Sequence, residues 1–304
     1  MASLSAIVPA TNEPATLDAC VSAIRDAAQP PDELIVITDA TAPGPAAARN
    51  EGAQRASGDI IAFIDADVVV HEDAFTRIRA AFQSDPSLVA VFGSYDDTPV
   101  EDGVVTGFRN LLHHFVHQSS SGEAATFWAG LGAIRREAFV AAGGFDERYA
   151  VPSIEDIELG MRLAAEGRKM VLDPSLQGTH LKRWSLGQMV TTDLRRRGVP
   201  WVLLLLERRT PSSALNLGWR HRLSAGLSLV ALGATVTRRP RLVTASLGGL
   251  VALNRAFYGL LWRRQGPGRM VAGVGLHALH HLTGVAAVPL ALALYLRSRR
   301  SRSS

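Results

Sequence analysis

The stretch that decides the fold is RNEGAQRASGDIIAFIDAD, residues 49–67. Its DIIAFI portion is an apolar run rich in isoleucine, which is typical of a strand buried on both faces of a sheet. Asp65 and Asp67 follow this run directly. Ligands of an open α/β sheet bind outside the carboxyl ends of the strands. Two carboxylates at this point therefore predict a polar ligand, such as a metal ion carrying a diphosphate.

The segments around this stretch alternate between strand and helix patterns. Strands are expected at 5–10, 33–38, 59–65 and 88–95. Helices are expected in between, at about 14–28, 46–57 and 72–83. This order predicts an α/β fold with a doubly wound, mainly parallel sheet flanked by helices and joined by right-handed crossovers.

The middle of the chain is less regular. A helix is expected at 104–118, and the segment TFWAGLGAIRR (126–136) is a strand candidate. A second helix is expected over EDIELGMRLAAEG (155–167), capped at its start by Ser153. Two strands, KMVLD and QGTHLKR, and a helix from about residue 185 to 197 follow.

Charge is distributed very unevenly along the chain. Up to His180 there are 12 basic and 26 acidic residues, whereas beyond it there are 20 basic and 2 acidic residues. Three apolar segments lie in the basic part, at 223–236, 242–262 and 270–296. This pattern favours a membrane with anionic lipids over nucleic acid, because nucleic acid does not explain the long apolar runs. A buried helical subdomain is the alternative.

The composition therefore predicts two parts, a domain over residues 1–210 and a C-terminal membrane-associated helical region with a basic tail over residues 211–304. Two or three membrane crossings are expected, with the first two apolar segments forming a hairpin. The single cysteine, Cys20, excludes an intrachain disulfide and fits the buried face of a helix.

Several polar residues are candidates for chemistry. Asp65 and Asp67 are two residues apart at a strand end, so both side chains face the same way and can hold Mg²⁺ or Mn²⁺ and a sugar or ribose hydroxyl. Arg49 is either near nucleotide phosphates or a solvated ion-pair partner. Asp156 sits in the first turn of a helix, where an ionised carboxylate is favoured and can accept a proton. Glu155 and Asp156 can alternatively serve only to complement the helix N-terminus.

The nine histidines include several with unusual spacing. His180 follows a strand-like segment and is either a metal ligand or structural. His113 and His117 are four residues apart on a helix, but no carboxylate lies at the expected interval, so packing or substrate contact is preferred to metal binding. His277, His280 and His281 lie in an apolar stretch, where interfacial placement is preferred to a lipid-headgroup contact.

Together these motifs resemble the family 2 glycosyltransferases of the GT-A fold, over roughly residues 4–210. The segments that carry the resemblance are IVPATNE (7–13), RNEGAQRASGDIIAFIDAD, FWAGLGAIRREAFVAAGGFDE, EDIELGMRLAAEG and HLKRW (180–184). By this resemblance Asp156 is the catalytic base with Glu155 beside it, and the metal ligands are Asp67 and His180. The nucleotide-sugar site consists of Pro9, Ala10, Thr11, Glu13, Asp39, Arg49 and Asp65. The acceptor side includes Trp128, Gly130, Arg183 and Trp184.

The resemblance implies an inverting hexosyltransferase (EC 2.4) for cell-envelope polysaccharide, which moves one sugar from a nucleotide-diphosphate sugar to a lipid-linked or saccharide acceptor with Mg²⁺ or Mn²⁺. The protein is expected at the bacterial inner membrane with its catalytic domain in the cytosol. The alternatives are a catalytically silent membrane adaptor with the same fold and a nucleotidyltransferase on a related fold.

Overall fold

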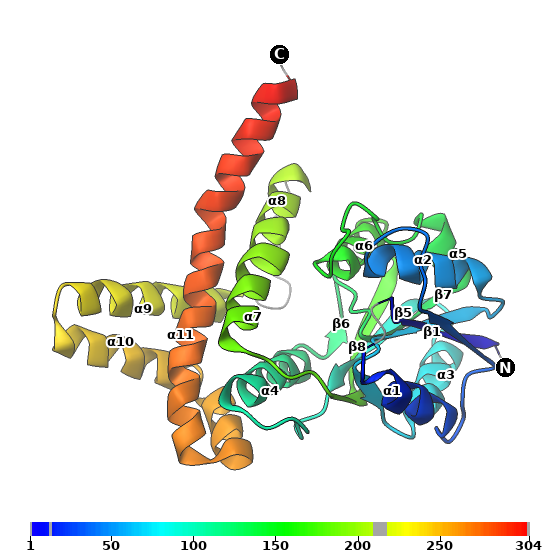
Figure 1. The fold of residues 1–304 in the computed structure, drawn as a ribbon, viewed down its shortest axis with the longest axis horizontal. Helices are drawn as coiled ribbons and strands as arrows, with labels where there is room; N and C mark the ends of the chain where they lie inside the picture. Colours follow the sequence, from blue (N-terminus) through cyan, green and yellow to red (C-terminus); the bar gives the residue numbers. More distant parts are fainter. Residues whose placement is uncertain (1, 12–13, 209–217, 303–304) are drawn as a thin grey trace. The chain divides into compact units, whose positions relative to one another are not determined.

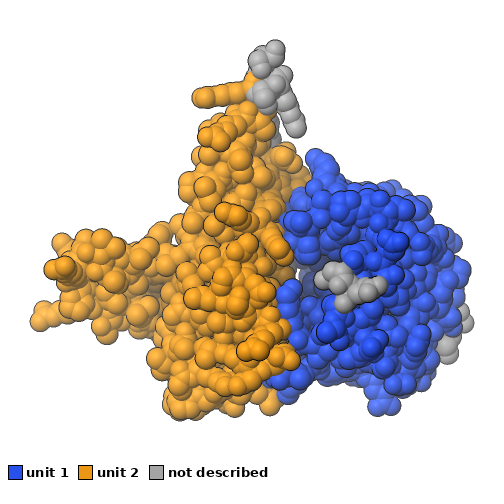
Figure 2. Space-filling view, in the orientation of Figure 1, with its two compact units in different colours: residues 1–100, 113–182 blue, residues 101–112, 183–304 orange. Residues whose placement is uncertain are grey.

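The structure, a computed structural model, describes residues 2–11, 14–208 and 218–302. It divides into two compact units, coloured separately in Figure 2. Unit 1 comprises residues 1–100 and 113–182, and unit 2 comprises residues 101–112 and 183–304. This division differs from the expected boundary at residue 210, because residues 183–208 group with the C-terminal helices. The assignment of catalysis to residues 1–210 stays a prediction.

Unit 1 is built on a sheet whose strand order is β2-β1-β3-β7-β5-β8-β4, with β6 paired to β8. The strands are β1 (Leu4–Pro9), β2 (Glu33–Ile37), β3 (Ile60–Ile64), β4 (Val68–Val70), β5 (Leu88–Tyr95), β6 (Gly122–Glu123), β7 (Leu131–Arg135) and β8 (Lys169–His180). Every residue of β3 is buried, as its uninterrupted apolar run predicts.

The α/β fold class is confirmed, but the sheet is mixed rather than mainly parallel. β1 pairs in parallel with β2 and β3, and β5 pairs in parallel with β8. The other pairs, β3/β7, β5/β7, β4/β8 and β6/β8, are antiparallel. An apolar run predicts that a strand exists but does not encode its direction. The two strands expected at 169–173 and 177–183 are one continuous strand, β8.

Helices cover both faces of this sheet, with α2, α5 and α6 on one face and α1 and α3 on the other (Figure 1). Their bounds are α1 (Leu17–Arg25), α2 (Pro45–Arg55), α3 (Ala74–Ser84), α5 (Arg136–Ala141) and α6 (Glu155–Ala165). α4 (Val104–Ser119) contributes its first part to unit 2 and its last part to unit 1. The core between sheet and helices includes packed aromatic rings, with Phe63 5.3 Å from Phe139 and 5.0 Å from Phe145.

α6 lies unusually close to the backbone that precedes β7. A Cβ atom placed on Gly160 would lie only 2.1 Å from the backbone nitrogen of Phe127. Glycine at this position therefore lets α6 approach that segment, which carries Trp128 and Gly130. Ile154, rather than the expected Ser153, is the N-cap of α6, and its side chain cannot cap. The Ser153 amide instead donates to the Glu155 carboxylate at 2.9 Å.

Unit 2 consists of helices (Figure 1). They are α7 (Leu186–Thr191), the π-helix η1 (Thr192–Gly198), α8 (Val199–Arg208), α9 (Trp219–Val236), α10 (Pro240–Leu253) and α11 (Arg255–Arg302). α9 packs against α10, and α11 contacts α8, η1 and α9. Within the long α11, Gly266 has a positive φ of 82° and interrupts the helical geometry.

One helix in the described part of the chain, spanning Arg255–Arg300, is long and apolar enough to cross a membrane by length and composition. This finding differs from the expected two or three crossings. The apolar run at 242–262 is broken at Asn254, the C-cap of α10. α10 has 14 residues, and at about 1.5 Å per residue it is roughly 21 Å long, short of a hydrocarbon core of about 30 Å.

Candidate active site

The carboxyl ends of three neighbouring parallel strands place several predicted residues at one edge of the sheet. Pro9, Ala10 and Thr11 follow or end β1, and the Ala10 amide donates to the Ile37 carbonyl of β2 at 2.8 Å. Asp39 is exposed just beyond β2. Asp65 and Asp67 follow β3. Glu13, the remaining residue predicted for this part of the site, lies outside the described residues.

Arg49 of α2 joins the donor-side acids to α6. Its guanidinium is buried and bridges two carboxylates, at 2.6 Å to Asp65 and 2.9 Å to Glu155. Burial alone would lower the pKa of Arg49, but the charges of Asp65, Glu155 and Asp156 raise it, so the side chain stays cationic. Arg49 is therefore an ion-pair partner, as the alternative expected, but its ion pairs are buried rather than solvated. Direct contact with a nucleotide phosphate would compete with these ion pairs.

Asp65 and Asp67 are distinguished by their surroundings. Burial raises the pKa of Asp65, although Arg49 opposes this shift. For Asp67, burial alone also raises the pKa, but the hydrogen bond and charge of His180, with Lys182, lower it overall. Asp65 is thus engaged by Arg49, whereas Asp67 faces His180.

Asp67 and His180 are brought together by strand pairing. β4 runs antiparallel to the end of β8, with Val68 opposite His180, and the Leu181 amide donates to the Asp67 carbonyl at 2.8 Å. His180 Nε2 lies 3.5 Å from Asp67 Oδ2. No group of three His, Cys, Asp or Glu side chains in the described residues is arranged to hold a metal ion. The Asp67 carboxylate would suit Mg²⁺, which is commonly bound through one or two carboxylates plus substrate phosphates, and the assignment of Asp67 and His180 as metal ligands stays a prediction.

Asp156 and Glu155 have different environments although they are adjacent in the first turn of α6. Glu155 is buried and paired with Arg49, whereas Asp156 is half-buried. The amides of Ala129 and Ile157 donate to Asp156 at 3.2 and 2.8 Å, which favours the ionised carboxylate. The amide of Asp65 donates to the carbonyl of Gly130 at 3.0 Å. Residues 129 and 130 therefore hold Asp156 and Asp65 from one short backbone segment.

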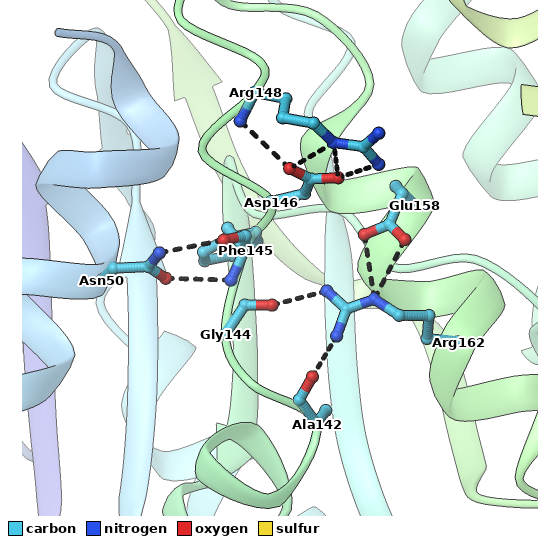
Figure 3. Close-up of polar contacts among 8 residues, drawn as sticks. All are labelled: Asn50, Ala142, Gly144, Phe145, Asp146, Arg148, Glu158 and Arg162. Carbon is cyan, nitrogen blue, oxygen red and sulfur yellow. Dashed lines mark hydrogen bonds and ion pairs between the residues drawn. The ribbon is translucent and has the colours of Figure 1, made fainter. Parts of the chain in front are cut away.

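Sequence reasoning missed the residues that hold the loop between α5 and α6 (Figure 3). Asn50 exchanges two 2.9 Å hydrogen bonds with the backbone of Phe145. Arg162 donates to the carbonyls of Ala142 and Gly144 and pairs with Glu158 at 3.0 Å. Gly144, with φ +72°, gives the loop its left-handed turn. The i, i+4 spacing of Glu158 and Arg162 was visible in the sequence, but its link to the loop was not.

The predicted acceptor-side residues fall in both units. Trp128 and Gly130 belong to unit 1, and both are buried. Arg183 and Trp184 belong to unit 2, where the Trp184 amide donates to Thr106 Oγ1 at 3.0 Å and the Arg109 guanidinium lies 4.9 Å from the Trp184 ring. Their part in acceptor binding stays a prediction.

The histidines with unusual spacing are packed inside the units. His114 and His117 of α4 place Nδ1 2.8 Å from the carbonyls of Tyr95 and Gly93 in β5. In unit 2, His277 and His281 are buried, and His277 Nδ1 lies 2.9 Å from the Tyr258 hydroxyl. The packing of α11 therefore encloses these two residues within unit 2, and the placement of the α11 histidines at a membrane interface stays a prediction.

This mixed sheet with carboxylates at its strand ends is a GT-A-like fold. It is similar to the mannosyltransferase PcManGT from Pyrobaculum calidifontis in complex with GDP-Man and Mn²⁺, with a TM-score of 0.54 and 16% identity over 96% of this chain and 87% of that one. It is also similar to GalNAc-T7 in a crystal structure with UDP, GalNAc and Mn²⁺, with a TM-score of 0.51 and 17% identity over 68% of this chain and 48% of that one.

Residues 40–141 match the family described as Glycosyl transferase family 2. The N-acetylglucosaminyl-diphospho-decaprenol L-rhamnosyltransferase of Mycobacterium tuberculosis is 33% identical over 108 residues, which are 36% of this chain and 35% of that protein. The O-antigen biosynthesis protein RfbC of Myxococcus xanthus is 29% identical over 141 residues, which are 41% of this chain and 11% of that protein. The part of the chain that matches glycosyl transferase family 2 is therefore residues 40–141, and the chain covers about a third or less of the length of these curated relatives.

Proposed function

We propose that the protein is an inverting glycosyltransferase that moves one sugar from a nucleotide-diphosphate sugar to a hydroxyl of a lipid-linked acceptor. One observation carries the proposal. The Ala129 amide donates to Asp156, and the adjacent Gly130 carbonyl accepts from the Asp65 amide, so a candidate base and the donor-side acids share one backbone support. Such shared support holds both sides of a displacement reaction in a defined geometry.

In this proposal Asp156 takes the proton of the acceptor hydroxyl as its oxygen attacks the anomeric carbon. The bond from that carbon to the diphosphate oxygen breaks, and its electron pair leaves with the nucleoside diphosphate. Asp67 and His180 would hold Mg²⁺ or Mn²⁺, which supplies Lewis-acid neutralisation of the leaving diphosphate when bound. Glu155 acts indirectly, by keeping Arg49 against Asp65.

The donor side is proposed at the ends of β1 and β2. Pro9, Ala10, Thr11 and Asp39 lie there at the same edge as Asp65. Pyrobaculum PcManGT with GDP-Man and Mn²⁺, and GalNAc-T7 with UDP and Mn²⁺, support a nucleotide-sugar donor and a divalent metal. The exposed carboxylate of Asp39 is suited to hydrogen bonds from the nucleoside.

A lipid-linked acceptor is supported by two observations. The Mycobacterium relative is named as acting on a diphospho-decaprenol substrate. Unit 2 carries a helix of membrane-spanning length together with the basic excess of the C-terminal part. We therefore propose that the protein acts at the bacterial cytoplasmic membrane, with unit 1 in the cytosol, in cell-envelope glycan synthesis.

The test uses membranes that contain the full chain, Mn²⁺ or Mg²⁺, and a panel of radiolabelled nucleotide sugars. We expect label from one donor to enter the organic phase on solvent partition. Asp156→Asn should abolish this transfer. Asp18→Asn is the matched control, because Asp18 is an exposed acid in the first turn of another helix, α1, and should leave transfer unchanged. Transfer at the wild-type rate by Asp156→Asn would refute the assignment of the base.

A further inference from the structure

His180 is held by a ring that the proposed chemistry does not use. The imidazole of His180 lies face to face with the phenol ring of Tyr95, with ring centroids 4.1 Å apart and planes only 7° apart. Both side chains are buried. A stacked neighbour at this distance resists rotation of the imidazole about its Cβ–Cγ bond, because rotation would drive one ring into the other.

The sheet brings the two rings together. Tyr95 is the last residue of β5 and His180 is the last residue of β8, and these strands are parallel neighbours with Tyr95 opposite Gly178. The amide of Asp96 also donates to the Gly178 carbonyl at 3.0 Å, which extends the pairing past Tyr95. The backbone of both strands therefore sets the separation of the two rings.

Tyr95 is itself fixed on other sides. Its carbonyl oxygen lies 2.8 Å from His114 Nδ1. Its ring centroid lies 4.2 Å from that of His113 and 4.9 Å from that of Trp128, which meets it edge-on at 90°. A ring packed in this way is a rigid support, since a shift of Tyr95 would require its neighbours to repack.

We propose that Tyr95 is a positioning residue that holds the His180 imidazole with Nε2 toward Asp67, and so determines how well this pair binds a divalent cation. The inference rests on the proposed function. The orientation matters because Nε2 is 3.5 Å from Asp67 Oδ2, a separation at which both atoms can reach one cation only if the ring stays in place. Groups that orient metal ligands typically change metal affinity about 10–100-fold when they are mutated.

The test measures Mn²⁺ binding to the purified full chain, by the electron paramagnetic resonance signal of free Mn²⁺, with and without UDP or GDP. Tyr95→Leu removes the stack and should raise the Mn²⁺ dissociation constant about 10-fold, within the range for such supporting groups. Tyr95→Phe keeps the ring and should leave the constant within about twofold of wild type, since the stack needs no hydroxyl.

Two controls separate positioning from general loss of stability. Phe75→Leu removes a buried ring from α3 in the same unit and should not change Mn²⁺ affinity. Tyr95→Met serves as a second non-aromatic variant if Tyr95→Leu does not fold. Mn²⁺ affinity that is unchanged in the folded non-aromatic variant, while His180→Ala weakens it, would overturn the positioning role alone. Unchanged affinity in both His180→Ala and Asp67→Ala would overturn the metal site of the proposed function and this inference together.

Discussion

Each unit contains a buried arginine that joins parts of the fold through ion pairs, and the two arginines have different surroundings. In unit 1, Arg49 joins Asp65 to Glu155, and both acids are next to half-buried carboxylates, Asp67 and Asp156. In unit 2, Arg109 of α4 pairs with Asp193 of η1 at 2.8 Å, and His280 of α11 lies 2.8 Å from the same carboxylate.

The unit 2 network ties three helical segments, α4, η1 and α11, together. The difference teaches that one kind of buried ion pair serves two purposes. In unit 1 it lies beside the carboxylates of the proposed active site, and in unit 2 it joins helices.

The largest expected effect comes from breaking either network. Arg49→Ala and Arg109→Ala should each lower the free energy of unfolding by about 3–5 kcal/mol, because each removes the buried cation that pairs with a buried carboxylate. Cys20 is the single cysteine and lies buried in unit 1, and burial raises its pKa to about 12. The rate of Cys20 alkylation therefore reports on the unfolding of unit 1. This rate should rise more in Arg49→Ala than in Arg109→Ala.

Arg55→Ala is the matched control, since Arg55 is an exposed arginine of α2 whose partner, Glu51, lies one turn away. Arg55→Ala should lower the free energy of unfolding by less than about 1 kcal/mol, because an exposed ion pair contributes little to stability. Equal acceleration of Cys20 alkylation by Arg49→Ala and Arg109→Ala would show that the units unfold together.

Acid should weaken the unit 2 network in a defined pH range. Burial alone raises the pKa of Asp193, but His280 and Arg109 lower it overall. A carboxylate with a lowered folded-state pKa stabilises the fold above its unfolded pKa of about 3.9, and this contribution is lost as pH falls through the lower folded value. Below about pH 4, the free energy of unfolding of the wild type, measured in urea, should therefore fall. Asp193→Asn lacks this contribution at every pH, so its free energy of unfolding should fall less over the same range. Parallel pH profiles of the two proteins would contradict this prediction.

A smaller effect is expected where the two units differ in the space around a glycine. A Cβ atom on Gly130 would lie 2.4 Å from the Trp128 ring, whereas nothing lies within 4 Å of one on Gly187 in α7. Gly130→Ala should lower the free energy of unfolding by about 1–3 kcal/mol through overpacking. It should also reduce the rate of sugar transfer, because the Gly130 carbonyl accepts a hydrogen bond from the Asp65 amide. Gly187→Ala should be neutral or stabilise by up to about 1 kcal/mol. Thermal unfolding and the transfer assay measure both effects, and wild-type behaviour of Gly130→Ala would contradict the close contact.

The smallest effect concerns how helices begin. Ser185 caps α7 with a reciprocal pair of bonds to Gln188, whereas the N-cap of α6 in unit 1 is Ile154, which makes no side-chain cap. Ser185→Ala should lower the free energy of unfolding by about 1 kcal/mol, whereas Ser185→Asp, which can also cap the helix, should retain most of it. Urea unfolding distinguishes the two variants, and an equal loss in both would indicate that the serine hydroxyl is not acting as a cap.

Periodicity and residue type in the sequence alone were enough to predict much of unit 1. Strands β1, β2, β3 and β5 and helix α4 lie where they were expected, because buried strands and amphipathic helices leave strong local patterns. The α/β class and the placement of Asp39, Asp65 and Asp67 at strand ends follow from the same patterns. The family resemblance stated from these motifs is confirmed by the match of residues 40–141.

Only the tertiary structure decided which residues meet. Residues that are 16 to 106 positions apart meet in three features of unit 1. These features are the antiparallel pairing of β7 with β3, the bridging of Asp65 and Glu155 by Arg49, and the stacking of Tyr95 on His180. A local pattern records how much of a side chain is buried, but strand direction, ion pairing and ring stacking depend on partners that local periodicity does not specify.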